Sequence, residues 1–161
     1  IDTANQFKTD LTIVKSVISS NNTRKLLLTK RLEKILDGKL KNKTVTFLGV
    51  TFKPNTDDMR EASSIQMIKY LNKKKSNVRY YDPSGEKHEF KKLKNVKYYN
   101  DISSACLNSD LIVLHTEWND FKLLNFKKIV KKNKFKVFDM RNIYSPTKMK
   151  KLKIDYFGIG R

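Results

Sequence analysis

From Lys43 onward, short apolar runs alternate with helical patterns, and this alternation most limits the folds open to the chain. Helical spacing is clearest at Ile65, Ile68 and Leu71. Nearly continuous apolar strands that alternate with helices predict a parallel sheet covered on both faces, which is an α/β fold. The strand-like runs are Thr44–Val50, Val78–Tyr81, Val96–Tyr99, Leu111–His115, Lys136–Met140 and a segment near Tyr156.

The segment before this alternation has a different pattern. From about Asp10 to Asp37, apolar residues are spaced by three and four, which predicts a long helix that stops at Asp37-Gly38. Its weak point is Ser19-Ser20-Asn21-Asn22, because these residues are poor helix formers. They either break the helix or lie as small polar residues at a close contact. We therefore divide the chain into a helical segment, 1–42, and an α/β domain, 43–161.

The formal net charge of +19 suggests a nucleic-acid or anionic membrane partner at first. The lysines, however, are spread through the chain and lack interleaved aromatic residues that stack on bases. Clusters such as Lys73-Lys74-Lys75 fall where helices would end, and positive charge there interacts favourably with the helix dipole. A coding bias toward A-rich codons would give the same excess of lysine and asparagine without any function attached to it. Because no apolar stretch approaches the roughly 20 residues of a membrane span, we expect neither a nucleic-acid nor a membrane partner.

Few side chains suit metal binding or covalent catalysis. The one cysteine, Cys106, excludes an intrachain disulfide and fits a reducing cytoplasm, where we expect the protein to reside. We expect Cys106 to be a buried or half-buried helix residue, His88 to be solvated and His115 to be structural. The adjacent carboxylates Asp57 and Asp58 more often cap backbone amides or orient a nearby arginine, so we expect no metal site.

The polar stretch Gly49–Ser64, GVTFKPNTDDMREASS, follows the first apolar run and precedes a helix. A strand, a loop and a helix in this order often hold a phosphate through the glycine fingerprint G-x-G-x-x-G. That fingerprint is missing, because the next glycine after Gly49 is Gly85. An anion at this loop must therefore be held by side chains, and Lys53 and Arg60 are its only cations.

Parallel sheets bind ligands beyond the carboxyl ends of their strands. A capping box formed by Ser63 and Gln66 is predicted at the start of the helix after the first loop. The sequence places all its motif-like segments on the carboxyl edge of the sheet. The segments are the loop after Gly49, the Tyr81-Asp82-Pro83 turn, Thr116-Glu117-Trp118 and Asp139-Met140-Arg141-Asn142.

Five segments resemble, in chain order, the carboxyl-terminal half of the nucleotide-sugar 6-dehydrogenases of the UDP-glucose/GDP-mannose dehydrogenase family. They are GVTFKPNTDDMREASS, YYDP, LHTEW, FDMRNIY and YFGIGR. FKPNTDDMRE is the most specific, because it matches almost without gaps. The resemblance covers essentially the whole chain and points most to enzymes of UDP-glucose. It implies a Rossmann-like, UDP-sugar-binding domain at 43–161, preceded by the end of a central helical region at 1–42.

Enzymes of this family oxidise the sugar C6 alcohol to a carboxylate in two NAD-dependent steps, through a covalent intermediate on a cysteine. The resemblance implies a UDP-sugar substrate, NAD as cofactor and a homodimer through the helix 10–37, with Asn21 near the two-fold contact. The family's GGSC-type motif, followed by a Lys-Asp pair, has no counterpart here, and Cys106 lies in the wrong domain. We therefore expect a fragment without catalytic residues that is inactive alone.

Four positions match residues with roles in the family. Phe52 and Lys53 resemble the Phe-Lys pair that contacts the substrate, and Arg141 resembles the arginine that helps hold UDP. Arg60 resembles the arginine that reaches NAD across the interdomain cleft, although a surface ion pair with its acidic neighbours explains it equally well. A diphosphate carries about two negative charges, which Lys53 and Arg141 would meet with charge-assisted bonds.

Two alternatives to UDP-glucose oxidation stay open. UDP-N-acetylhexosamine and GDP-mannose dehydrogenases share the architecture, and the resemblance implies that the residues that contact the sugar lie mostly upstream of this chain. A non-catalytic nucleotide-binding or assembly module, with the helix 10–37 serving dimerisation, is the second alternative.

Overall fold

The computed structural model describes residues 2–160, without the side chains of Asp2 and Asn5, so that the last residue of the YFGIGR segment lies outside the described part. Two helices come first, α1 (Asp2–Gln6) and α2 (Thr12–Ile35). The strands are β1 (Thr44–Leu48), β2 (Asn77–Tyr81), β3 (Val96–Tyr98), β4 (Leu111–Leu114), β5 (Lys136–Asp139) and β6 (Asp155–Gly158). The other helices are α3 (Ser63–Lys73), η1 (His88–Phe90), α4 (Ile102–Cys106), η2 (Asn119–Phe121), α5 (Phe126–Val130) and α6 (Pro146–Lys151).

The strands form one six-stranded, wholly parallel sheet with the order β3-β2-β1-β4-β5-β6. This is the order of a Rossmann fold, in which the chain direction across the sheet reverses between β1 and β4. Ligand sites in such sheets lie outside the carboxyl ends of the strands at that reversal. The predicted α/β, Rossmann-like fold is confirmed.

Helices cover both faces of the sheet, as the nearly continuous apolar strands predict. On one face, Val45 and Phe47 of β1 pack in a core with α3 and the end of α2. On the other face, Leu48 belongs to a second core with side chains of α4, α5 and α6, including Cys106. Alternation along β1 thus fills two cores, because successive strand residues point to opposite faces. Cys106 is a buried helix residue, as predicted.

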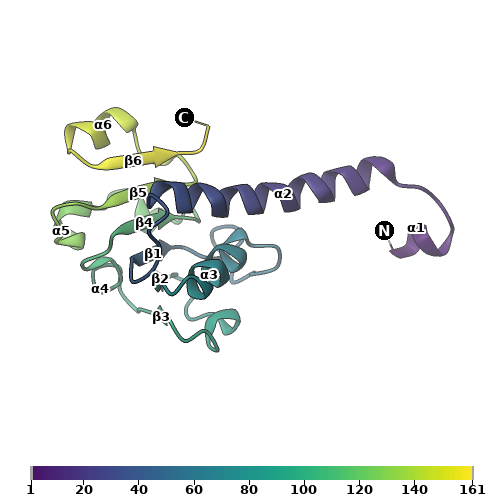
Figure 1. The fold of residues 1–161 in the computed structure, drawn as a ribbon, viewed down its shortest axis with the longest axis horizontal. Coiled ribbons are helices and arrows are strands. Elements are labelled where there is room, and N and C mark those ends of the chain that lie inside the picture. Colours follow the sequence, from purple (N-terminus) through teal and green to yellow (C-terminus); the bar gives the residue numbers. More distant parts are fainter. Residues whose placement is uncertain (1, 161) are drawn as a thin grey trace.

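Helix α2 runs unbroken through Ser19–Asn22, so that this polar stretch does not end it. Its buried residues lie toward the carboxyl end, at Thr29, Leu32 and Ile35. The amino-terminal part projects away from the sheet and carries α1 at its far end (Figure 1). On this projection, Ile13 and Val17 are 81% and 62% exposed. An apolar stripe on α2 therefore has no cover from the described part of the chain.

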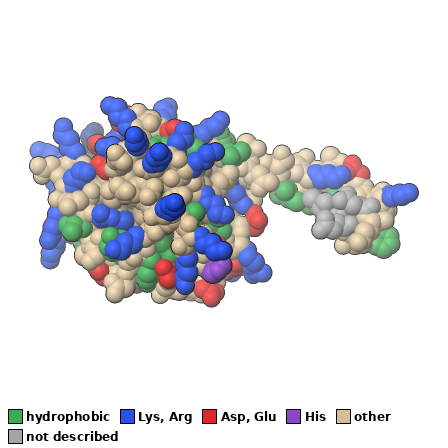
Figure 2. All heavy atoms as spheres, turned by 60° about the horizontal axis from the view of Figure 1, so that its bottom comes forward, with side chains coloured by type: hydrophobic (Ala, Val, Ile, Leu, Met, Phe, Trp, Pro, Cys, Tyr) green, Lys and Arg blue, Asp and Glu red, His purple; other side chains and the backbone are tan. Residues whose placement is uncertain are grey.

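Lysine and arginine side chains are scattered over the whole visible face of the globular part, with acidic side chains among them (Figure 2). They do not gather in a single stripe along one element on that face. This distribution favours the interpretation of the lysines as a solvated surface. Among the described residues, no helix combines the length and apolar character that crossing a membrane requires.

Candidate functional site

A cavity of about 140 Å³ lies where the carboxyl edge of the sheet meets α2. The loops after β1, β4 and β5 all reach it, as the parallel sheet predicts, and α2 closes it from the side. Its lining residues are Asn21, Arg24, Lys25, Leu28, Phe52, Glu61, Ala62, Ser63, His115 and Arg141. Two of the four predicted site residues, Phe52 and Arg141, are among them.

The end of β1 is held close to β4 through Gly49. The φ angle of Gly49 is +74°, and a Cβ atom on it would lie 2.7 Å from the Cβ of Thr116. Any other residue at this position would therefore strain the backbone, and its Cβ would overlap with Thr116. Glycine here serves close backbone approach and not a phosphate fingerprint.

Asp82, in the YYDP segment, fixes the chain direction after β1. Its buried carboxylate accepts hydrogen bonds from the backbone N–H groups of Val50, at 2.7 Å, and Thr51, at 3.3 Å. The Nζ of the buried Lys87 lies 3.9 Å from the same carboxylate. A buried carboxylate needs such partners, because an unpaired one is strongly destabilising. Asp82 therefore positions the loop that carries Phe52 and Lys53.

The side chains of Phe52 and Lys53 lie in different surroundings. Phe52 is 50% exposed and lines the cavity, and its carbonyl oxygen accepts a hydrogen bond from the Nη2 of Arg141 at 3.4 Å. Lys53 is exposed and is absent from the lining, and its ammonium group has no hydrogen-bond or ion-pair partner within residues 2–160. The structure thus joins Phe52 to Arg141 and leaves the side chain of Lys53 outside the cavity.

Arg141 is tied to the end of β4. Its Nε donates a hydrogen bond to the backbone oxygen of His115 at 2.7 Å. The same Nε lies 2.8 Å from the Oε2 of Glu117, which makes an ion pair without hydrogen-bond geometry. Glu117 and Arg141 lie in the segments LHTEW and FDMRNIY, but nothing in either segment predicts that the two side chains pair.

The loop that carries Arg141 is organised by the buried Asp139. One oxygen of Asp139 accepts from the backbone N–H of Arg141 at 3.0 Å. The other accepts from the backbone N–H of Tyr144 at 3.0 Å and from the hydroxyl of Tyr156 at 2.8 Å. Asp139 thus orders the loop after β5 as Asp82 orders the loop after β1, and both loops are held by a buried carboxylate.

His115 is buried in a chain of hydrogen bonds. The hydroxyl of Thr116 donates to the carbonyl oxygen of Thr51 at 2.6 Å, so it accepts from the Nδ1 of His115, 3.0 Å away. The Nε2 therefore carries no proton and accepts from the hydroxyl of Ser63 at 2.9 Å. Burial, aided by the charge of Arg141, lowers the pKa of His115 to about 3, which keeps the ring neutral.

The predicted capping box at Ser63 is wrong. Helix α3 begins at Ser63 itself, the residue before it is Ala62, and no side chain makes the capping bond. The hydroxyls that could cap are used elsewhere: Ser63 donates to His115, and Ser64 donates to the carbonyl oxygen of Val50. Tertiary hydrogen bonds thus replace the local pattern that the sequence suggests.

Arg60 forms the surface ion pair that the sequence left open. Its Nε and Nη2 donate to the two carboxylate oxygens of Asp58 at 3.0 and 2.9 Å. These bonds lower the pKa of Asp58 to about 2. The Arg60 side chain is 89% exposed and is not part of the cavity lining. Because exposed pairs are weak, this contact leaves the guanidinium available to a second anion.

Helix α2 contributes to the cavity, which the motifs in the sequence do not predict. Arg24 is exposed and has no hydrogen bond or ion pair to the described part of the chain, whereas Lys25 bonds to Glu61. A signal was present, since Asn21, Arg24, Lys25 and Leu28 follow the spacing of one helix face. That spacing marks a shared face but not what the face meets.

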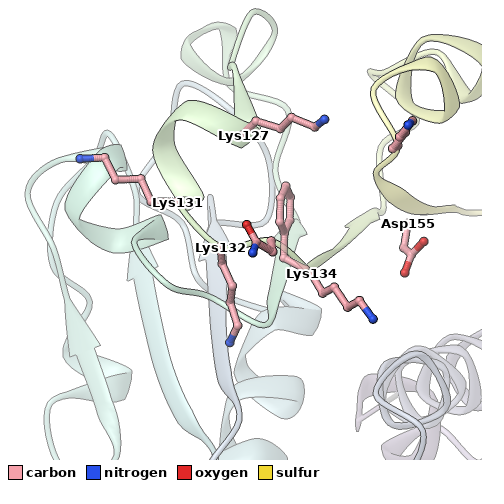
Figure 3. A pocket seen from close by; sticks show the side chains of 8 residues that line it. Lys127, Lys131, Lys132, Lys134 and Asp155 are labelled. Atoms are coloured by element: carbon pink, nitrogen blue, oxygen red, sulfur yellow. The ribbon is translucent and has the colours of Figure 1, made fainter.

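A larger cavity, of about 750 Å³, lies at the opposite, amino-terminal edge of β5 and β6. Five of its lining residues are lysines: Lys127, Lys131, Lys132, Lys134 and Lys153. Lys131 and Lys132 point away from each other and do not converge on one point (Figure 3). The Nζ of Lys132 instead bonds to Asp110 at 2.8 Å. This lysine basin, as we call the cavity, is far from every predicted site residue in the sheet topology.

A family model described as the UDP binding domain of the UDP-glucose/GDP-mannose dehydrogenase family matches residues 46–146. The chain belongs to this family. A UDP-glucose 6-dehydrogenase of Rickettsia felis is 39% identical over 94% of the chain, which covers 34% of that protein. One of Rhizobium meliloti is 31% identical over 100% of the chain and 37% of that protein. The chain thus spans about a third of the length of these family members.

Solved structures of the family have the same fold. A UDP-glucose dehydrogenase from the archaeon Pyrobaculum islandicum matches with a TM-score of 0.76 and 25% identity, over 98% of this chain and 34% of that one. A GDP-mannose dehydrogenase from Pseudomonas aeruginosa, at 20% identity, matches with a TM-score of 0.67 over 98% of this chain and 36% of that one, which shows the fold alone. The resemblance drawn from the motifs is confirmed.

The loop between β1 and α3 does not fit the pyrophosphate of NAD in the usual Rossmann manner. That manner needs free backbone N–H groups at the end of the first strand. Here Asp82 accepts from those of Val50 and Thr51. The exposed Arg60 does fit a phosphate that approaches from outside the domain, so its predicted role toward NAD stays a prediction. Among the described residues, no group of acidic, His or Cys side chains suits a metal ion.

Proposed function

We propose that this chain binds the UDP end of a UDP-sugar in an NAD-dependent nucleotide-sugar 6-dehydrogenase. The observation that carries the proposal is the meeting of Arg141 and Phe52 at one cavity on the carboxyl edge, in a chain that matches the UDP binding domain of the family. Positive charge at the carboxyl edge of the sheet, where the chain direction reverses between β1 and β4, suits a diphosphate.

The roles follow from the side chains. The guanidinium of Arg141, held by His115, would meet a phosphate with its remaining N–H groups. The exposed ammonium of Lys53 would add a second charge from the loop, and the half-exposed Phe52 would pack against the ligand. When bound, NAD would accept the hydride from the sugar, and Arg60 is the residue that we propose to contact it.

We propose UDP-glucose as the sugar nucleotide, oxidised to UDP-glucuronate in two hydride transfers. Support comes from the relatives, which include UDP-glucose 6-dehydrogenases at 31% to 39% identity. UDP-N-acetylhexosamine and GDP-mannose remain the alternatives. Cys106 does not serve as the nucleophile in this proposal, because burial raises the pKa of its thiol to about 12 and lowers its reactivity. We therefore expect no turnover from the chain alone.

We also propose that two copies pair through α2 in the cytoplasm. The exposed stripe at Ile13, Val14, Val17 and Ile18 supports the pairing, because a second copy would remove it from water. Asn21, the predicted residue of the two-fold contact, lies on the same helix and also lines the cavity. The free, buried thiol of Cys106 is consistent with a reducing compartment.

Titration calorimetry with UDP, GDP and uridine tests the proposal. We expect saturable binding of one UDP per chain, weaker binding of GDP, and binding of uridine weaker by more than ten-fold, because uridine lacks the diphosphate. Equal affinity for UDP and uridine would show that the diphosphate adds nothing to binding, which would contradict the proposed contacts of Lys53 and Arg141 with it. Absence of UDP binding would overturn it.

A further inference from the structure

We infer that the 140 Å³ cavity is a phosphate subsite in which Arg24 of α2 contacts the diphosphate of a nucleotide ligand beside Arg141. The inference rests on the proposed function and adds to it a residue from the helical segment. The shared chemistry is a diphosphate, which either the UDP-sugar or NAD would bring.

The charges of the lining carry the first step. Three cations, Arg24, Lys25 and Arg141, line the cavity together with one carboxylate, Glu61. Lys25 and Glu61 bond to each other and so neutralise each other. The charge that remains is that of Arg24 and Arg141. Two like charges at one small cavity are unfavourable without a counter-ion, and an anion between them would relieve that repulsion.

The partners of the two arginines carry the second step. Arg141 uses its Nε on the backbone oxygen of His115, and Glu117 partly balances its charge. Arg24 has no such contact: no hydrogen bond or ion pair joins its guanidinium to any residue from 2 to 160. All its N–H groups are therefore available, and guanidinium geometry matches phosphate oxygens in pairs.

The size of the cavity defines which part of a ligand fits. At about 30 Å³ for each water molecule, 140 Å³ corresponds to between four and five waters. Pockets that take a whole ligand begin at about 300 Å³. The cavity thus suits a phosphate group and not a nucleoside. Ser63 is not a donor here, because it gives its proton to His115, whereas the amide of Asn21 is a further donor at the wall.

Calorimetry at constant ionic strength on the Arg24→Gln variant tests the inference, with inorganic pyrophosphate, UDP and NAD as separate probes. Lys30→Gln is the matched control, because Lys30 is exposed on the same helix and is not part of this cavity. We expect Arg24→Gln to weaken pyrophosphate about ten-fold and Lys30→Gln to leave it within two-fold. A parallel loss for UDP alone assigns the diphosphate to the sugar nucleotide, and a parallel loss for NAD alone assigns it to the cofactor.

The remaining outcomes separate the inference from the proposed function. Unchanged binding of pyrophosphate and UDP by Arg24→Gln would overturn the inference and leave the UDP proposal standing. Loss of pyrophosphate binding in Arg24→Gln, in a chain that does not bind UDP, would support the subsite and overturn the UDP proposal. Equal losses in Arg24→Gln and Lys30→Gln would show a general charge effect, and no binding of any probe would overturn both.

Discussion

The Nε of Arg141 donates to the backbone oxygen of His115 at 2.7 Å, which ties the loop after β5 to the end of β4. The Nη2 of the same guanidinium reaches the carbonyl oxygen of Phe52 at 3.4 Å, so that one side chain spans the ends of β5, β4 and β1. Arg141 is therefore already oriented before any ligand arrives. Such orientation lowers the entropy that binding must overcome.

The first prediction concerns the cations of the proposed UDP site. Lys53→Ala and Arg141→Ala should each weaken UDP about ten-fold or more, because a charge-assisted hydrogen bond contributes about 1.5 to 3 kcal/mol and a decade of affinity corresponds to about 1.4 kcal/mol. Arg60→Ala is the internal control and should leave UDP affinity nearly unchanged, since Arg60 is bonded to Asp58 outside the cavity. Titration calorimetry measures all three.

A different pattern would change the interpretation of this site. Equal losses from Lys53→Ala, Arg141→Ala and Arg60→Ala would mean a diffuse effect of the net charge of +19. A double variant in the lysine basin, Lys127→Gln with Lys134→Gln, distinguishes the two cases, because it removes two charges at the opposite edge of the sheet. It should leave UDP affinity unchanged if the site is local.

The second prediction concerns acid stability. The pKa of His115 is lowered from its ordinary 6.5 to about 3, so between these values the unfolded chain binds a proton that the folded chain does not. The free energy of unfolding should therefore fall as the pH drops below about 6.5, by at most about 1.4 kcal/mol per pH unit. Urea titrations between pH 7.5 and 4.5 measure this slope.

Replacing the ring isolates its contribution. His115→Asn should lower stability at pH 7.5, since it disrupts the bonds to Ser63 and Thr116, but it should also flatten the slope between pH 6.5 and 4.5. His88→Asn, at an exposed position, should keep the slope of the parent chain. An unchanged slope in His115→Asn would show that other groups cause the acid dependence.

The third prediction separates backbone strain from steric overlap at two glycines. Gly49 and Gly85 both have positive φ angles, +74° and +89°, but a Cβ on Gly85 would meet nothing within 4 Å. Gly85→Ala should cost about 1 to 2 kcal/mol of unfolding free energy through strain alone. Gly49→Ala should cost about 1 to 3 kcal/mol more, because its Cβ would press on Thr116. Similar losses at both glycines would argue against the close approach of β1 and β4.

The fourth prediction concerns the proposed pairing through α2. Val17→Asp places a charge in the exposed apolar stripe and should shift the chain toward the monomer, which light scattering across a concentration series detects. Ser19→Asp adds the same charge on the opposite side of the helix and should leave the assembly unchanged. A parent chain that is monomeric at every concentration would contradict the pairing.

Local patterns predicted the elements well, because strands and helices here obey their own periodicity. The run Leu111–His115 contains β4, and the spacing from Asp10 to Asp37 contains all of α2. Whether Ser19–Asn22 break the helix could not be predicted, since propensity alone does not show whether the neighbouring turns keep these residues helical. The strand order was not predictable from these patterns, because it depends on which strands pair.

The site was predictable only as far as strand ends meet at one edge. Phe52 and Arg141 lie together for that reason. Arg24 was not found, because its place depends on how α2 packs against the sheet, and no residue within the helix encodes that angle. Ser63 was misassigned to a cap, since its partner, His115, is distant in the sequence.

The engagement of the Val50 and Thr51 amides by Asp82 has a consequence for how this domain changes over evolution. A site built from main-chain amides is common to every sequence that adopts the turn, and a point mutation leaves those amides in place. In the site that we propose, anions are attracted by exchangeable side chains, and the buried carboxylates hold only the loops after β1 and β5. One substitution can therefore retune the preferred ligand, while Asp82 and Asp139 hold the architecture constant.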